Sequence, residues 1–362
     1  MSDTPGRGQT AERAIACGDA DRYGRGTRRG GADPLISAGP SEGGGPMEPA
    51  AAQALAEKIR GSVRTAVVGR DLALELILTG VVADGHLLLE DVPGLGKTLI
   101  AKSFAAALGL DFQRIQFTAD LLPHDITGGE VLEPARGSFA FRPGPLFANV
   151  LLADEINRAP PKVQSALLEA MQEYQVTSDR STYPLPRPFL VLATENPLEL
   201  EGTYPLPEAQ VDRFLMRLKI GYPTPEEEAA ILARRRARRT ESVTAPTVTN
   251  PDEVRALQAA VEDVELEPSI AGYVVELVRA TRDDPRAEVG ASPRGSLAVQ
   301  KVARARALLA GRDFVLPDDV KAIAEPALAH RIVVKPEPWI RGVRGDAIVR
   351  AALERTPVPK VG

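Results

Sequence analysis

Short apolar runs separated by mixed segments dominate the first two thirds of the chain. Residues 87–89 and 150–153 are continuously apolar, and residues 189–194 form a longer apolar run. Such runs are typical of parallel strands that are buried on both faces. Residues 112–117 resemble a further strand, and residues 214–220 alternate apolar with basic side chains, as an edge strand does. The pattern predicts an α/β fold built on a parallel sheet.

Two stretches between these runs predict β-hairpins. Residues 128–145 contain two strand-like pieces around a turn near residues 136–138, and residues 174–185 alternate around a turn at residues 178–181. Because loops on a rigid scaffold often bind ligands or partners, we assign both hairpins to substrate contact. The alternative is a pair of solvated hairpins without that function.

Only helical patterns follow from residue 222 onward. Thr224, Pro225 and Glu227 form a capping box with proline at the first helical position, and Asn250 and Ser292 precede prolines that open further helices. The chain is therefore expected to comprise a tail (residues 1–49), an α/β nucleotide-binding domain (50–221), an all-α helical domain (222–335) and a C-terminal segment that packs on the helices (336–362).

The tail differs from the rest in composition. Residues 1–49 are rich in Gly and Arg and nearly lack aromatic and branched apolar side chains, whereas 44% of the whole chain is hydrophobic. A segment of this composition cannot bury enough apolar surface to offset its chain entropy. We expect it to be disordered.

Composition and charge narrow the class of protein. A single cysteine excludes an intrachain disulfide, and the three histidines are too dispersed to predict a zinc cluster. No apolar run is long enough for a membrane span, and the N-terminus lacks an apolar signal core, which favours a cytoplasmic protein. The net charge of −5 provides no overall attraction to nucleic acid, so protein partners are expected instead.

A glycine-bearing turn directly after the strand at residues 87–89 predicts a P-loop. Glycines let backbone N–H groups converge on a triphosphate, the helix N-terminus adds its positive dipole end, and the lysine supplies a charge. Thr98 offers a hydroxyl ligand for Mg²⁺. Asp91 stands where glycine usually opens the motif, a departure that leaves the later glycines in place. The expected contacts to ATP are Pro93, Gly94, Leu95, Gly96, Lys97, Thr98 and Leu99.

Polar side chains follow two of the other apolar runs. Asp154 and Glu155 come at the end of one, and Asn196 follows the other. Parallel strands bring their carboxyl ends to one sheet edge, beside the P-loop. We expect Asp154 to hold Mg²⁺, Glu155 to polarise the attacking water, and Asn196 to hold that water or touch the γ-phosphate. The alternatives are an acidic helix cap and a turn-forming asparagine.

Four further residues are candidates for nucleotide contact. Val68 and Gly69 separate two helical segments before the P-loop strand and could wall an adenine pocket, with core packing as the alternative. Arg213 precedes the fifth strand, on the far side of the domain from its own P-loop. Arg294 falls in the first turn of a helix, where the dipole disfavours a cation, which suggests a ligand anion. A surface arginine is the alternative.

From about residue 50 onward, the chain resembles the MoxR family of AAA+ ATPases. The similarity rests on LLLEDVPGLGKT, QFTADLLPHDITG, GPLFANVLLADEINRAPPKVQSALLEAMQE, LVLATENP, EGTYPLPEAQVDRFLM, GYPTPEEEA and GASPRGSLAVQ. It implies an AAA+ sheet of order 5-1-4-3-2 with helices on both faces and a helical lid. It also implies a ring of six subunits with ATP at each interface, Arg213 as an arginine finger acting across it, and Arg294 as the lid's sensor. Glu195, where glutamine is expected, is a second departure.

The resemblance also implies the reaction and its use. The expected chemistry is hydrolysis of ATP to ADP and phosphate with Mg²⁺, and the energy would remodel or mature a client protein, through complex assembly or cofactor insertion. A protein with a von Willebrand A domain is the expected partner. Two alternatives stay open, a nucleic-acid translocase or helicase-like motor and the motor subunit of a magnesium chelatase. The net charge of −5 speaks against the first.

Overall fold

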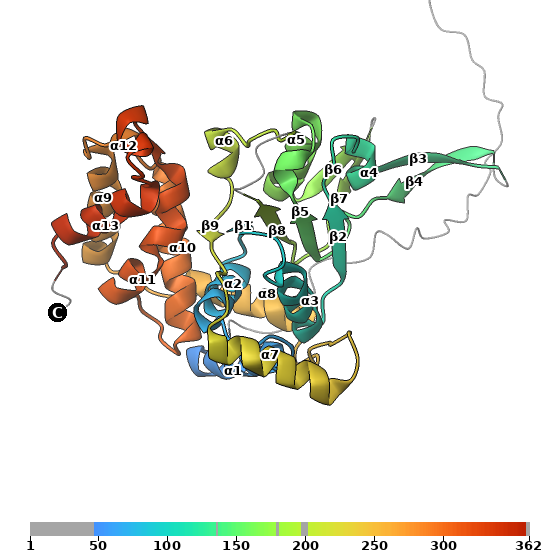
Figure 1. Ribbon diagram of the computed structural model, residues 1–362, viewed down its shortest axis with the longest axis horizontal. Coiled ribbons are helices and arrows are strands. Elements are labelled where there is room, and N and C mark those ends of the chain that lie inside the picture. The colour runs from blue at the N-terminus through green and yellow to red at the C-terminus, as the bar shows by residue number, and fades with distance from the viewer. Residues whose placement is uncertain (1–46, 135–136, 179–180, 197–201, 360–362) are drawn as a thin grey trace, which may run out of the picture. The chain divides into compact units, whose positions relative to one another are not determined.

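A five-stranded parallel sheet lies at the centre of the fold (Figure 1). The computed structural model describes residues 47–134, 137–178, 181–196 and 202–359. The strand order is β2-β5-β8-β1-β9. Counted along the chain as five core strands, this is the predicted order 5-1-4-3-2, with the fifth strand at an edge as expected. The strands are β1 (Leu87–Glu90), β2 (Phe112–Gln116), β5 (Val150–Asp154), β8 (Leu190–Glu195) and β9 (Met216–Leu218).

Some expectations concern residues outside these ranges. Most of the predicted tail (residues 1–49) falls outside them, since the description begins at residue 47. Positions 135–136 and 179–180, at the two hairpin turns, also fall outside them. Among the helices of the described ranges, none is long and apolar enough to cross a membrane.

Two apolar clusters cover the two faces of the sheet. Successive strand residues point to opposite faces, so Leu87 and Leu89 belong to one cluster and Leu88 to the other. All three side chains are at most 1% exposed, which explains why the strand is continuously apolar. The helices in the first cluster include α1 (Pro49–Ala66), α2 (Asp71–Val82) and α3 (Lys97–Leu108), and those in the second include α4 (Pro123–Thr127) and α5 (Pro161–Glu173).

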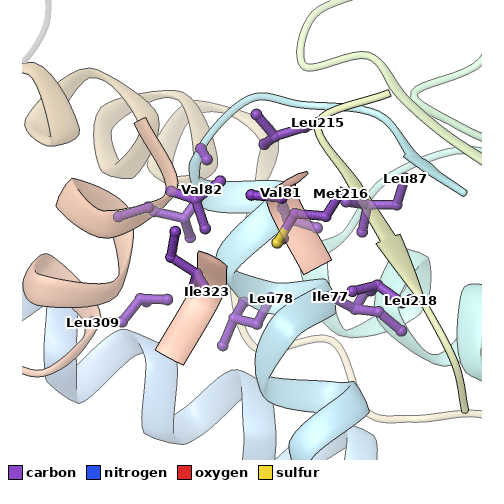
Figure 2. Packing of buried hydrophobic residues seen from close by; sticks show 14 of the residues in the cluster. Ile77, Leu78, Val81, Val82, Leu87, Leu215, Met216, Leu218, Leu309 and Ile323 are labelled. Atoms are coloured by element: carbon purple, nitrogen blue, oxygen red, sulfur yellow. The ribbon is translucent and has the colours of Figure 1, made fainter. Parts of the chain in front are cut away.

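The first cluster continues from the sheet into the C-terminal helices. Figure 2 shows Leu78 of α2 and Met216 of β9 in the same packed group as Leu309 and Ile323. The last two residues belong to the C-terminal helices α10 (Pro293–Leu309) and α11 (Pro317–Leu328). Removing such a buried side chain typically costs about 2–5 kcal/mol. The described residues between positions 47 and 359 accordingly belong to one compact unit.

The segment after β9 is helical, as predicted. Thr224 Oγ1 accepts the Glu227 N–H at 3.3 Å, and the Glu227 carboxylate accepts the Thr224 N–H at 3.0 Å, which completes the predicted capping box. A short antiparallel pair, β10 (Ala287–Val289) with β11 (Val333–Val334), interrupts the helices and was not predicted. The helices are α7 (Pro225–Arg238), α8 (Pro251–Ala260), α9 (Pro268–Arg282), α10 (Pro293–Leu309), α11 (Pro317–Leu328), α12 (Pro336–Ile340) and α13 (Gly345–Arg355).

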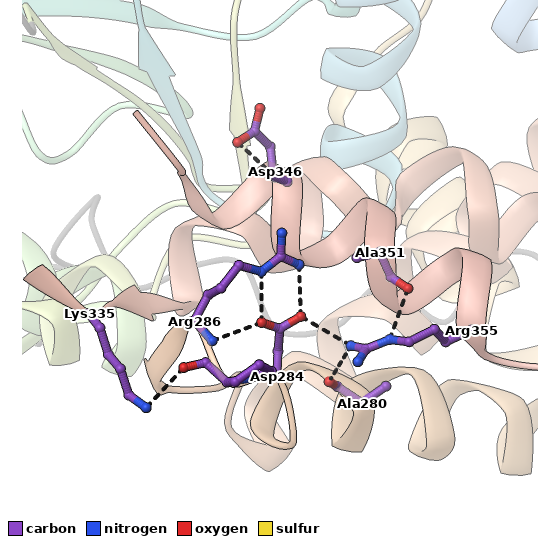
Figure 3. A network of polar contacts seen from close by, with 9 residues as sticks. Ala280, Asp284, Arg286, Lys335, Asp346, Ala351 and Arg355 are labelled. Atoms are coloured by element: carbon purple, nitrogen blue, oxygen red, sulfur yellow. Dashed lines mark hydrogen bonds and ion pairs between the residues drawn. The ribbon is translucent and has the colours of Figure 1, made fainter. Parts of the chain in front are cut away.

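An ion-pair network fastens α13 to the end of α9 (Figure 3). Asp284, whose side chain is 2% exposed, accepts hydrogen bonds from Arg286 at 2.8 Å and from Arg355 of α13 at 3.1 Å. The hydrogen bond from Arg286 holds the pKa of Asp284 below its usual value. The C-terminal helix is therefore held by charge as well as by apolar packing. The domain limits at residues 222 and 336 remain predictions.

Both predicted hairpins are present. One consists of β3 (Gly128–Glu133) and β4 (Ser138–Pro143), and the other of β6 (Gln175–Ser178) and β7 (Ser181–Pro184). Figure 1 shows the β3–β4 hairpin projecting away from the sheet. Phe139 on this hairpin is 67% exposed.

Candidate functional site

The strand order gathers the residues predicted to bind phosphate, magnesium and the attacking water at one edge of the sheet. β1 lies beside β8, and β8 beside β5, all parallel, with Glu90 opposite Glu195 in register. The residues that follow these strands therefore emerge side by side at the carboxyl edge. They are the P-loop, Asp154 with Glu155, and Asn196.

The P-loop has the backbone shape that anion binding requires. Gly94 and Gly96 have φ angles of +86° and +82°, and no atom lies within 4 Å of the place where a Cβ would stand at either position. Only glycine adopts such angles without strain, and the bare backbone leaves the N–H groups accessible. Leu95 between them is 5% exposed and packs inward. The helix α3 begins at Lys97 directly after this turn.

Lys97 lies near the carboxylates of the other two strand ends. Its ammonium group donates to the Asp91 main-chain oxygen at 2.6 Å. Burial lowers the pKa of Lys97. The carboxylates of Asp91, Asp154 and Glu155 oppose that shift, which places them within electrostatic range of the ammonium group.

Asp91 has a role that its departure from the usual motif did not suggest. Its carboxylate accepts hydrogen bonds from the backbone N–H groups of Ile220 and of Gly221, the latter at 3.3 Å. These residues follow the edge strand β9 and lead into α7. The carboxylate therefore ties the start of the P-loop to the connection into the helical segment, a contact that glycine cannot make.

Thr194 of β8 contacts both acids at the end of β5, Asp154 and Glu155. Its hydroxyl donates to Asp154 Oδ1 at 2.6 Å and accepts the Glu155 N–H at 2.8 Å. Glu155 has a φ of +57°, an unusual angle for a residue other than glycine. The hydroxyl compensates for this geometry by satisfying the Glu155 amide, and sequence reasoning did not identify Thr194.

Two residues of β2 also reach the acids. Arg114 Nη2 donates to Asp154 Oδ2 at 2.6 Å, and Gln116 Nε2 donates to Glu155 Oε2 at 2.8 Å. Arg158 also contacts Glu155, at 3.1 Å. The sequence analysis missed these partners, although β2 is the neighbour of β5 with Gln116 in register with Asp154. Both acids therefore hold side-chain partners that a bound nucleotide and its water would have to replace.

Asn196 lies directly after β8 and is 5% exposed. The preceding residue, Glu195, is opposite Glu90, which pairs with Arg217 at 3.4 Å. Burial raises the pKa of Glu195 to about 7, and the Glu90 carboxylate adds to the shift. The glutamine expected at this position would carry no charge. Glu195 instead places a second carboxyl group beside Glu90, and this raises its pKa.

The two predicted base-binding residues lie beside the first turn of α7. Val68 and Gly69 are partly exposed, whereas Val67 is 3% exposed and belongs to the core. The Arg70 N–H donates to Glu227 Oε1 at 3.4 Å, and a side chain at Gly69 would collide with that carboxylate. Gly69 also has a φ of +66°, and this left-handed conformation is what favours glycine at the position, since the end of the Glu227 side chain could move aside.

Arg213 and Arg294 lie together at the opposite edge. The Leu215 N–H donates to the His86 oxygen at 2.8 Å, and Leu87 is opposite Met216, so Arg213 precedes β9 at the amino edge of the sheet. The two arginines line a common cavity of about 290 Å³. Arg294 pairs with Asp212 at 3.7 Å. The structure thus separates both arginines from Lys97 by the length of the strands.

The carboxyl edge has the chemistry that a magnesium nucleotide needs. Thr98 in the first turn of α3 and Asp154 at the end of β5 carry side-chain oxygens, the kind of ligand that Mg²⁺ prefers, and could hold the ion. Within the described residues, no group of three or more His, Cys, Asp or Glu could hold a metal ion. Two protein ligands fit an ion that keeps most of its waters and takes its remaining ligands from phosphates.

Comparison with known proteins agrees with this geometry. Residues 86–216 match the ATPase family associated with various cellular activities (AAA), and residues 279–352 match the AAA lid domain. The chain is 48% identical to the Bacillus subtilis protein YeaC over 82% of this chain and 92% of that protein. It is 43% identical to chaperone MoxR1 of Mycobacterium tuberculosis, over 83% and 81% respectively. A crystal structure from Cytophaga hutchinsonii superposes with a TM-score of 0.81 at 40% identity, covering 86% of this chain and 97% of that one. The chain belongs to the MoxR family of AAA+ ATPases.

Proposed function

We propose that this protein hydrolyses ATP to ADP and phosphate at sites shared between two copies of the chain. The observation that carries the proposal is the division of the candidate residues between the two sheet edges. Lys97, Asp154 and Glu155 meet at the carboxyl edge, whereas Arg213 and Arg294 line a cavity at the amino edge. A complete site needs both groups, and one chain cannot bring both to the same phosphate.

Each residue has a distinct role in this proposal. The backbone from Pro93 to Leu99 cradles the phosphates, with Lys97 neutralising charge that develops in phosphoryl transfer. Thr98 and Asp154 hold Mg²⁺, which neutralises phosphate charge when bound. Glu155, released from Gln116 and Arg158, orients the attacking water, and Asn196 lies one strand away from it.

The neighbouring chain supplies the remaining charge. Arg213 acts as an arginine finger on the γ-phosphate bound by the next subunit, with Arg294 contributing a second cation from the same cavity. Such a finger is worth on the order of 10³-fold or more in turnover. Head-to-tail contacts of this kind close into a ring, and six subunits is the expected number.

The energy is proposed to remodel a client protein. Support comes from the relative named chaperone MoxR1 and from the net charge of −5, which offers no general attraction to nucleic acid. The β3–β4 hairpin, with Phe139 exposed, is the proposed client contact, and a von Willebrand A domain protein is the proposed partner. DNA-stimulated turnover at physiological salt would favour a nucleic-acid motor instead.

Mixing two inactive variants tests the shared site. Arg213→Ala and Glu155→Gln proteins should each be nearly inactive alone. An Arg213→Ala subunit still holds nucleotide with its own Glu155, and a Glu155→Gln neighbour still donates Arg213. Their mixture should therefore recover measurable ATPase activity. No recovery at any ratio, with subunit exchange confirmed by energy transfer between labelled chains, would refute the shared site.

A further inference from the structure

A buried arginine of the helical lid donates hydrogen bonds to the turn that carries Arg213. Arg331 ends the short helix η3 (Ala329–Arg331), within the part of the chain that matches the AAA lid. Its Nη2 donates to the Phe214 oxygen at 2.9 Å, and its Nη1 donates to the Asp212 oxygen at 3.4 Å. Nη1 also lies 3.4 Å from Asp212 Oδ1. The guanidinium therefore holds the residue before Arg213 and the residue after it.

The Asp212 carboxylate receives further contacts from the lid. Ser292 Oγ donates to Asp212 Oδ2 at 3.4 Å, and Arg294 Nη1 lies 3.7 Å from the same oxygen. Ser292 is the N-cap of α10. Two separate lid elements, η3 and the start of α10, therefore converge on one carboxylate next to Arg213.

The Arg331 side chain is buried, so its charge needs well-placed partners. Its side chain is 2% exposed, whereas the side chain of Arg294 is 49% exposed. Burial lowers the pKa of Arg331 to about 10, with Asp212 opposing the shift, so the group is protonated at neutral pH. A buried cation is costly unless its partners are well placed. Those partners are the main-chain oxygens of the turn, the Asp212 carboxylate and His330 Nε2 at 2.8 Å, whereas Arg331 Nε has no hydrogen-bond partner among the described residues.

We propose that Arg331 is the positioning residue for Arg213, and that it couples the orientation of the lid to the arginine finger of the same chain. The proposal rests on the proposed function, which assigns Arg213 to the phosphates of the neighbouring subunit. A planar guanidinium suits this task because its donors form a rigid fork that engages two oxygens at once. The lid and the finger of one subunit then move together relative to the nucleotide of the next.

The mixed ring supplies a test with an internal control. Arg331→Met is placed either in the Glu155→Gln subunit, which donates Arg213, or in the Arg213→Ala subunit, which has no finger to position. The substitution strains the fold equally in both placements. We expect recovered turnover to fall on the order of 10²-fold in the first placement, since a displacement of about 1 Å can cost that much, and to persist in the second.

The possible outcomes separate the two proposals. Equal loss in both placements, or no loss in either, overturns the positioning role of Arg331. Absence of recovery in the reference mixture, without any change at Arg331, refutes the shared site itself.

A second variant keeps the test decisive if Arg331→Met does not fold. Arg331→Lys retains the charge but cannot engage both main-chain oxygens. As a uniform ring it should lose turnover while the KM for ATP stays the same, because the P-loop of each chain is untouched. A raised KM at unchanged kcat would contradict the proposal.

Discussion

The two edges of the central sheet hold different parts of the proposed catalytic site, and they are built in different ways. At the carboxyl edge, Lys97, Glu155 and Asn196 each follow their own strand or its turn directly. At the amino edge, Arg213 stands in a turn held by Arg331, and the contact from Arg331 to the Asp212 oxygen spans 119 positions of the chain. The candidate residues at the carboxyl edge are placed by the strands that they follow, although Asp91 also reaches across 130 positions to Gly221. The turn at the amino edge is held by contacts from the lid.

This difference predicts different consequences of substitution. A change at the carboxyl edge should act on the nucleotide of the same chain and should follow the chemistry of the residue replaced. A change at the amino edge should act on the nucleotide of the neighbouring subunit by displacing Arg213. Substitutions at three positions of the carboxyl edge, Lys97, Asp91 and Glu195, test how far its effects stay within one chain.

The largest effect is expected from Lys97→Ala. The substitution removes the side-chain cation of the P-loop, so ATP turnover should fall on the order of 10³-fold or more. Steady-state phosphate release measures it. Lys102→Ala, on an exposed position of the same helix, is the matched control and should retain turnover. Equal turnover in the Lys97 variant and the control would remove the P-loop from the mechanism.

A smaller effect is expected from Asp91→Gly, which restores the usual P-loop residue. Glycine leaves the Ile220 and Gly221 N–H groups without their carboxylate partner, which should cost about 1–2 kcal/mol of unfolding free energy and raise the KM for ATP roughly 10-fold. Denaturant unfolding and saturation kinetics measure the two quantities.

Asp91→Asn separates anchoring from charge, because it keeps an acceptor oxygen and loses the negative charge near Lys97. It should behave like the parent protein. Tighter ATP binding in both variants would show that the charge, and not the anchor, is what Asp91 contributes.

The smallest effect is expected from Glu195→Gln and concerns stability against pH. The folded-state pKa of Glu195 is about 7, above the ordinary value of 4.5. Between these two pH values the folded protein keeps a proton that the unfolded chain has released. Its contribution to stability is therefore largest below pH 4.5 and is lost as pH rises through 7. The variant should be more stable than the parent at pH 8 by roughly 1–2 kcal/mol, and the difference should shrink as the pH falls toward 4.5.

Denaturant unfolding at both pH values measures the Glu195 effect. The control is Glu173→Gln, at an exposed glutamate. A stability difference that is the same at both pH values would place its origin in packing and not in the titration of Glu195.

Much of the fold could be predicted from local patterns. Continuous apolar runs identified the buried strands, and the Thr224 capping box fixed the start of α7. The β10–β11 pair escaped prediction because strands of three and two residues leave too little alternation to recognise. The partners of Asp154 and Glu155 escaped prediction for a different reason. Arg114 and Thr194 belong to the two strands on either side of β5 and reach these acids only because of the strand register.

The sequence by itself determined the family, because its motifs are contiguous, and through that resemblance it implied the sheet order. It also predicted which turn binds the phosphates, because the glycines and the lysine of that turn are neighbours in the chain. Tertiary structure alone decided that Asp91 anchors the P-loop to the end of β9 and that Arg294 lies beside Arg213, away from Lys97. It also decided that Arg331 holds the turn that carries Arg213. These contacts join distant segments, and a charged side chain gives no sign in the sequence of which distant partner it will meet.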